Sequence, residues 1–163
     1  MDDKAKKGKQ ASIEGFAHEH IVAGILMKKL QNVSLVDLPL SPYDIIIVFK
    51  TEDGKEDIIR AQVKTARKSI SFTGGIRGGV DREYKSGVKE YVQTTETSDV
   101  VIGVHPLDDS FELYFVPTIL IEELKQKSIS LRKIAKLKNN YEILRHCKDR
   151  EFVINKCKEY GII

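Results

Sequence analysis

The sequence has few cysteines, no long apolar run and little net charge, and each shortage argues against a class of protein. Cys147 and Cys157 are its two cysteines. Two thiols in a lysine-rich chain without a secretory leader predict a reducing, cytoplasmic setting and free thiols. His146 stands beside Cys147, but two sulfurs and one histidine lack the paired spacing of a zinc site, so we expect no zinc there.

Long apolar segments are also missing. The longest uncharged apolar runs, such as IVAGILM and IIIVF, are far shorter than the roughly 20 residues that a helix needs to cross a bilayer. We therefore expect no contact with a membrane. Lys and Arg total 27 against 24 Asp and Glu, and the formal net charge of +3 permits a polyanionic partner without requiring one.

What the chain does contain is enough apolar sequence for one domain. Of its 163 residues, 41% are hydrophobic, which suffices for a single core. Residues 1–12 hold charged residues without an apolar period, and we expect a flexible basic tail there. The expected domain covers residues 13–163, with a core over about 13–118 and a helical extension over 118–163.

Apolar periodicity predicts the elements of this domain. A helix is expected over 13–30 with Ser12 as its N-cap, followed by a hairpin of two strands, YDIIIVFK and EDIIRAQVKTA, around the turn EDGK. One short strand and a glycine-rich loop are expected over 67–87, while VKEYVQTTETS fits helix or extended chain. DVVIGVHP and FELYFVP read as further strands, and the pattern from Thr118 onward is helical.

The first helix carries a carboxylate where an apolar residue is expected. On a wheel of roughly 100° per residue, Glu19 falls near the middle of the apolar arc. Its neighbours on that arc are Ile13, Phe16, Val22, Ala23, Leu26, Met27 and Leu30. A buried carboxylate is costly unless it meets a cation, so Glu19 predicts either an ion pair with an internal Lys or Arg, or a metal ion.

The second strand of the hairpin has one polar face. Arg60, Gln62 and Lys64 alternate along it with apolar residues. Asp44 begins the preceding strand, and closing the hairpin around its turn brings Asp44 near Gln62 and Lys64. A solvated edge strand with one ordinary Asp–Lys pair would give the same pattern.

An acid, an amide and an amine at one place suit metal-assisted hydrolysis of a phosphodiester. Mg²⁺ prefers hard oxygen ligands and keeps several waters, so one or two carboxylates and an amide oxygen suffice to hold it. The ion lowers the pKa of a bound water and neutralises developing charge. Lys64 could orient that water or stabilise the same charge.

Together these residues resemble the PD-(D/E)xK nuclease superfamily, which includes restriction endonucleases, Holliday-junction resolvases and some homing endonucleases. YDIIIV followed by QVKTA is most similar to the homing-endonuclease-like branch, in which glutamine replaces the usual acid. The resemblance spans about residues 13–118. It implies an α/β fold with a restriction-endonuclease-like αβββαβ core, in which helices flank a mixed central sheet.

The resemblance also implies a set of site residues. The implied catalytic residues are Glu19, Asp44, Gln62 and Lys64, and the implied ligands of Mg²⁺, for which Mn²⁺ should substitute, are Glu19, Asp44, Gln62 and the Val63 carbonyl. Two features depart from the pattern of the superfamily. Tyr43 separates Pro42 from Asp44, which matters little, and Gln62 is neutral, so metal affinity should be weaker and Glu19 more important.

The segment after Lys64 is the candidate DNA contact. Arg67, Lys68 and Arg77 stand among glycines, whose backbone amides can approach phosphates closely, and Arg82 extends the basic surface. An ordinary surface loop would have the same composition. An enzyme that cuts both strands of a duplex normally pairs two copies, so we expect a homodimer.

These observations predict a Mg²⁺-dependent endonuclease acting on double-stranded or branched DNA. Sequence-specific cleavage of the restriction or homing type is favoured over a junction resolvase. Two alternatives remain open: a catalytically inactive DNA-binding module of the same fold, with Gln62 marking a decayed site, and a small α/β interaction protein whose polar strand face is merely solvated.

Overall fold

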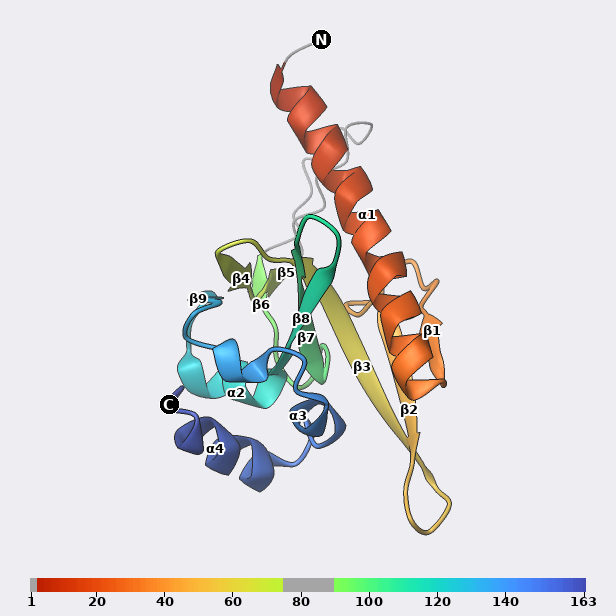
Figure 1. The fold of residues 1–163 in the computed structure, drawn as a ribbon, viewed down its shortest axis with the longest axis vertical. Coiled ribbons are helices and arrows are strands. Elements are labelled where there is room, and N and C mark those ends of the chain that lie inside the picture. The colour runs from red at the N-terminus through yellow and green to blue at the C-terminus, as the bar shows by residue number, and fades with distance from the viewer. Residues whose placement is uncertain (1–2, 75–89) are drawn as a thin grey trace.

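The computed structural model describes residues 3–74 and 90–163, and its centre is a mixed five-stranded sheet (Figure 1). The strands lie in the order β1–β2–β3–β7–β8, with β3 and β7 parallel and the other neighbours antiparallel. Their bounds are β1 Val33–Leu35, β2 Ile45–Lys50, β3 Glu56–Thr65, β7 Val100–Pro106 and β8 Phe111–Pro117.

Two small sheets and several helices complete the fold. The small sheets pair β4 (Ser69–Ser71) with β9 (Ser128–Ser130) and β5 (Thr73–Gly74) with β6 (Tyr91–Val92). The helices are α1 Asp3–Leu30, α2 Thr118–Leu124, α3 Tyr141–Arg145 and α4 Arg150–Glu159, with a 3₁₀ turn at Ala135–Leu137. These elements confirm the predicted class, an α/β fold with a mixed central sheet, flanking helices and C-terminal helices.

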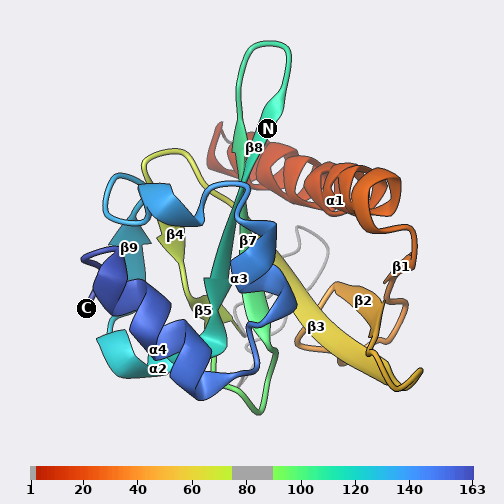
Figure 2. The same cartoon turned by 60° about the horizontal axis from the view of Figure 1, so that its bottom comes forward.

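Helices lie on two sides of the sheet. In Figure 1, α1 runs along the side of β1, β2 and β3, while α2, α3 and α4 gather on the side of β8. Figure 2 shows α4 lying beside α2, against which it packs. None of the helices in the described ranges is both long enough and apolar enough to cross a bilayer.

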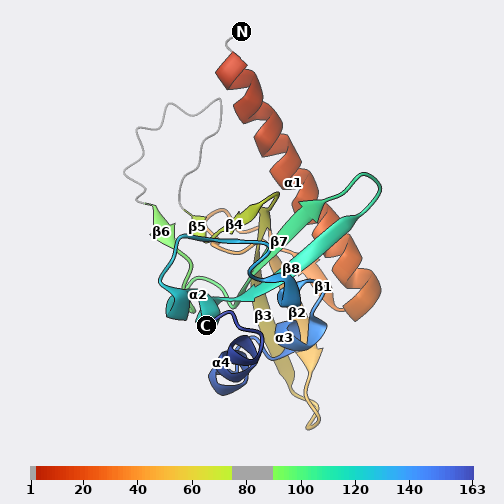
Figure 3. The ribbon, with the colours of Figure 1, turned by 60° about the vertical axis from the view of Figure 1, so that its left-hand side comes forward.

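The first helix is longer than the sequence predicted. It begins at Asp3, and Ser12, the expected N-cap, lies inside it with its hydroxyl donating to the Gly8 carbonyl at 3.1 Å. The segment before Ser12 is rich in Ala, Lys and Gln, which are good helix formers, so the helix continues without packing against the sheet. Figures 1 and 3 show this N-terminal part of α1 extending beyond the strands.

This projection divides the apolar arc of α1 into two parts. Val22, Ala23 and Leu26 are buried against the sheet, as the arc predicted. Ile13 and Phe16 lie on the projecting part and remain 59% and 64% exposed. Only the C-terminal half of the arc therefore contributes to the core.

The hairpin of β2 and β3 has the expected register. Ile45 pairs with Ala61 and Lys50 with Glu56, and the chain reverses through Gly54, whose φ of 80° favours glycine. The buried face of β3 consists of Ile59, Ala61 and Val63. The opposite, polar face is partly buried, and there Arg60 contacts Asp99 and Gln62 contacts Gln93.

The C-terminal region is less helical than its periodicity predicted. Where SISLRKIAKLKNNYEILRHC suggested one helix, the chain forms β9, a 3₁₀ turn and the short α3. Ile129 of β9 pairs with Ile70 of β4, and Asn139 adopts a φ of 51° that interrupts any helix. Asn140 then caps α3 by accepting from the backbone N–H of Ile143 at 3.1 Å.

Candidate active site

Asp44 lies beside Gln62 and Lys64, where the hairpin was expected to place it. It stands one residue before β2, and its backbone N–H donates to the Ala61 carbonyl at 2.9 Å. Its carboxylate accepts a hydrogen bond from the backbone N–H of Val63 at 2.8 Å. Because Val63 separates Gln62 from Lys64, this bond holds the carboxylate against the segment that carries the amide and the amine.

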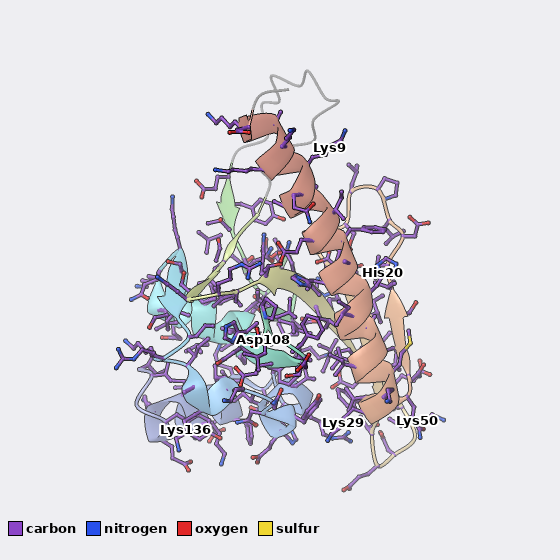
Figure 4. All side chains as sticks on the ribbon, turned by 45° about the horizontal axis from the view of Figure 1, so that its top comes forward. Lys9, His20, Lys29, Lys50, Asp108 and Lys136 are labelled. Atoms are coloured by element: carbon purple, nitrogen blue, oxygen red, sulfur yellow. The ribbon has the colours of Figure 1, made fainter. Side chains whose placement is uncertain are left out.

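Glu19 approaches this group from α1. The pKa of Glu19 is raised to about 7, first by burial and then by the charge of Asp44, while His20 partly opposes both effects. In Figure 4, His20 marks this middle stretch of α1, between Lys9 and Lys29. The repulsion by Asp44 means that the two carboxylates share one neighbourhood.

In the part of the chain that the structure describes, Glu19 does not form the ion pair with Lys or Arg that the simpler explanation required. Within residues 3–74 and 90–163, no Lys or Arg lowers the pKa of its carboxyl, and His20 is the one group there that does so. A half-buried carboxylate beside a second carboxylate is a place where an added positive charge lowers the free energy. The geometry therefore favours the metal explanation of Glu19 over the internal ion pair.

Lys64 lies in the same neighbourhood. Its side chain is partly buried, and desolvation lowers the pKa of its amine, while the nearby charge of Asp44 acts in the opposite direction. An amine that is both partly desolvated and held near a carboxylate is suited to contact a substrate phosphate or a water molecule. Structure and sequence thus agree in bringing Lys64 to Asp44.

His18 links α1 to the end of β3 and was not anticipated as a core residue. It is 5% exposed and its Nδ1 lies 2.7 Å from the Thr65 hydroxyl. Its ring also packs edge-on against Phe111. Because Glu19 follows His18 and Lys64 precedes Thr65, this contact holds α1 against the end of β3, next to the candidate site.

Gln62 is held by a residue that sequence analysis missed. The side-chain oxygen of Gln62 accepts a hydrogen bond from the side-chain amide of Gln93. Gln93 is completely buried and lies in the segment read as either helix or extended chain. Its one sequence signal is an isolated amide between apolar Val92 and a run of hydroxyl residues, which points to no particular partner.

The donors gathered here fit a hard divalent cation that keeps part of its water shell. No cluster of three or more His, Cys, Asp or Glu side chains with metal-binding geometry occurs in the described parts of the chain. Glu19 and Asp44 would be the acidic ligands of such an ion, and the Gln62 amide and the Val63 carbonyl are the neutral oxygens that the sequence also predicted. Mg²⁺ and Mn²⁺ accept such mixed sets, because water completes their coordination.

Two of the four predicted DNA contacts, Arg67 and Lys68, lie within the described residues. Arg67 is mostly exposed but its guanidinium forms an ion pair with Glu14 of α1. Lys68 is exposed at the start of the turn into β4. Arg77 and Arg82 lie outside the described residues. Lys68 is thus accessible to a polyanion. Arg67 would have to leave its ion pair with Glu14 before it could contact a phosphate.

Comparisons with known proteins give one likeness of fold. No protein-family model matches the chain, and no curated protein matches it. Among solved structures, the chain is similar to a bacterial homing endonuclease, I-Ssp6803I, with 15% sequence identity and a TM-score of 0.48. The similarity covers 74% of this chain and 76% of that one. We base the functional proposal on the side chains of the candidate site.

Proposed function

We propose that the chain is a Mg²⁺-dependent endonuclease that hydrolyses phosphodiester bonds in DNA. The observation that carries this proposal is the pair of neighbouring carboxylates, Glu19 and Asp44, of which Glu19 is half-buried and has no Lys or Arg partner among the described residues. The amine of Lys64 lies beside the same pair. Acids that need a cation, next to a desolvated amine, suit phosphodiester hydrolysis better than simple DNA binding.

Each residue of the site has a distinct task. Glu19 and Asp44 would hold the ion with their carboxylates, and the Gln62 amide oxygen and the Val63 carbonyl would complete the protein's share of its ligands. A bound ion would supply a more acidic water and neutralise charge on the phosphate. Lys64 would hold the scissile phosphate and stabilise the charge that develops on it.

The basic segment after β3 is the proposed DNA contact. Lys68 is exposed, and Arg67 can leave its exposed ion pair with Glu14 at little cost, because such surface pairs contribute only about 0–1 kcal/mol. Arg77 and Arg82 continue the same basic sequence. We favour double-stranded DNA cut at specific sequences by a homodimer, with branched DNA as the second substrate.

DNA cleavage tests the proposal. Supercoiled plasmid and a four-way junction are incubated with the protein and Mg²⁺ or Mn²⁺, beside the variants Asp44→Asn and Lys64→Met. We expect nicked or linear plasmid with the wild-type chain and a loss of at least about 100-fold in rate with either variant. Asp108→Asn and Lys50→Met are matched controls, because both side chains are exposed, Lys50 at the end of β2 and Asp108 between β7 and β8.

The neutral Gln62 favours a second candidate function, a DNA-binding module without catalysis. That function predicts salt-dependent binding of intact DNA with no cleavage in either metal. Cleavage that persists in both Asp44→Asn and Lys64→Met would instead indicate a contaminating nuclease and contradict the proposed site. Light scattering of the protein at micromolar concentration tests the dimer, and a monomeric mass would count against it.

A further inference from the structure

Gln93 is the most completely buried polar side chain next to the candidate site. It is 0% exposed, and its amide nitrogen donates to the side-chain oxygen of Gln62. Burying an amide is costly unless its donors and acceptors are satisfied, so a buried glutamine usually has a specific partner. Here that partner is a proposed metal ligand.

Two hydroxyl groups fix the orientation of the Gln93 amide. The Thr97 hydroxyl donates to the Gln93 side-chain oxygen at 2.6 Å, and the Ser98 hydroxyl donates to the same oxygen at 2.9 Å. With its oxygen occupied by two donors, Gln93 presents its nitrogen to Gln62. Gln62 must then turn its own oxygen, not its nitrogen, toward Gln93.

The turn that supplies these hydroxyls is anchored to the strand that carries Gln62. The Asp99 carboxylate accepts from the Arg60 guanidinium at 3.0 and 3.1 Å and from the Arg60 backbone N–H at 2.8 Å. Arg60 also donates to the carbonyls of Thr95 and Glu96 at 2.8 and 3.1 Å. Gln93 is therefore held at a fixed place relative to β3.

Orientation matters because Gln62 is neutral. A carboxylate would offer an oxygen in either rotamer, but an amide offers an oxygen at one end and a non-coordinating NH₂ at the other. An amide oxygen has two lone pairs, so the Gln62 oxygen can bind a cation while it accepts from Gln93. Partners of this kind, one step removed from an ion, commonly change metal affinity by about 10–100-fold.

We propose that Gln93 is a positioning residue that fixes the Gln62 amide with its oxygen available to a divalent ion. This inference rests on the proposed function. A carboxylate would offer an oxygen in any orientation, but a glutamine must be oriented. In this chain Gln93, Thr97 and Ser98 would supply that orientation for Gln62.

Binding of Mn²⁺ alone, measured by calorimetry or electron paramagnetic resonance, tests this role in a double-mutant cycle. The cycle compares the wild-type chain with Gln93→Met, Gln62→Ala and the double variant. We expect Gln93→Met to weaken Mn²⁺ binding about 10-fold in the wild-type background and less than about 2-fold once Gln62 is Ala. A merely structural role would weaken binding equally in both backgrounds.

Ser98→Ala provides a gentler second variant. It removes one donor to the Gln93 oxygen while the rest of the network stays in place, and we expect Mn²⁺ binding to weaken about 2–5-fold with little change in melting temperature. If Gln93→Met and Ser98→Ala both fold and bind Mn²⁺ as tightly as the wild-type chain, the inferred role of Gln93 is wrong, while the proposed function still stands. Failure of the wild-type chain to bind Mn²⁺ would overturn the proposed function together with it.

Discussion

Glu19 is the residue whose environment differs most from that of an ordinary helix carboxylate. Its pKa of about 7 comes first from burial and then from the charge of Asp44. The sequence could identify Glu19 because an acid on an apolar arc contradicts the helical period. It could not identify Gln93, since the contact between Gln93 and Gln62 joins residues 31 positions apart and follows no spacing rule.

The raised pKa of Glu19 predicts a pH-dependent stability. The folded state keeps the proton of Glu19 up to about pH 7, while the unfolded chain loses it near 4.5, so stability falls as pH rises through this window. Glu19→Gln removes the penalty. Because the side chain is only half-buried, we expect the variant to be more stable than wild type by about 1 kcal/mol at pH 8 without metal.

Urea unfolding of both chains at pH 4 and pH 8 measures this difference. At pH 4 the wild-type carboxyl is protonated in either state, and the gain should vanish. Equal stability of the two chains at pH 8, or a variant that is less stable there, would contradict the account of Glu19 as an uncompensated carboxylate.

At the scale of elements, the sequence pattern correctly predicted the hairpin, whose form depends on residues close together in the chain. The alternation along β3 and the turn at Gly54 fix the hairpin register, and the register places Asp44 opposite Gln62. The C-terminal segment was misjudged because its helical period is overridden by pairing of Ile129 with Ile70 and by the positive φ of Asn139. The strand pairing joins residues far apart in the sequence, and the break in the helix depends on one backbone angle. Neither can be predicted from the local apolar pattern.

The two halves of α1 should respond differently to truncation. Leu26 is completely buried, and Leu26→Ala should destabilise the protein by about 2–5 kcal/mol. Phe16 is 64% exposed on the projecting half, and Phe16→Ala should change stability by no more than about 0.5 kcal/mol. Urea unfolding of the two variants distinguishes them, and a large loss in Phe16→Ala would mean that the projecting half is packed in solution.

The ion pair of Arg60 and Asp99 joins β3 to the turn before β7. The Asp99 side chain is 9% exposed and the Arg60 side chain 30%. Asp99→Ala removes the acceptor of the Arg60 backbone N–H and the charged partner of its guanidinium, which keeps only the carbonyls of Thr95 and Glu96. We therefore expect a loss of about 2–3 kcal/mol in the free energy of unfolding.

A double variant, Arg60→Met with Asp99→Ala, separates pairing from packing. It should be less destabilised than the sum of the two single variants, because no charge is then left without its partner. Additive losses in urea unfolding would show that the two side chains act independently.

At the scale of the whole molecule, the candidate site is assembled from segments that are far apart in the sequence. Glu19 comes from the middle of α1, Asp44 from the start of β2, and Gln62 and Lys64 from the second half of β3. The contact of His18 with Thr65 and the burial of Leu26 bring the helix to this place on the sheet. The sequence placed each candidate ligand on its own element, but only the packing of α1 brings Glu19 to Asp44.

The central claim is that a divalent ion binds between Glu19 and Asp44, and proton release on Mn²⁺ binding tests it most directly. Titration calorimetry at pH 7, repeated in two buffers of different ionisation enthalpy, counts the protons released per bound ion. The pKa of Glu19 predicts release of about half a proton in the wild-type chain, and Glu19→Gln should remove that release and weaken binding. Mn²⁺ binding with the same affinity and the same proton release in Glu19→Gln would contradict the claim.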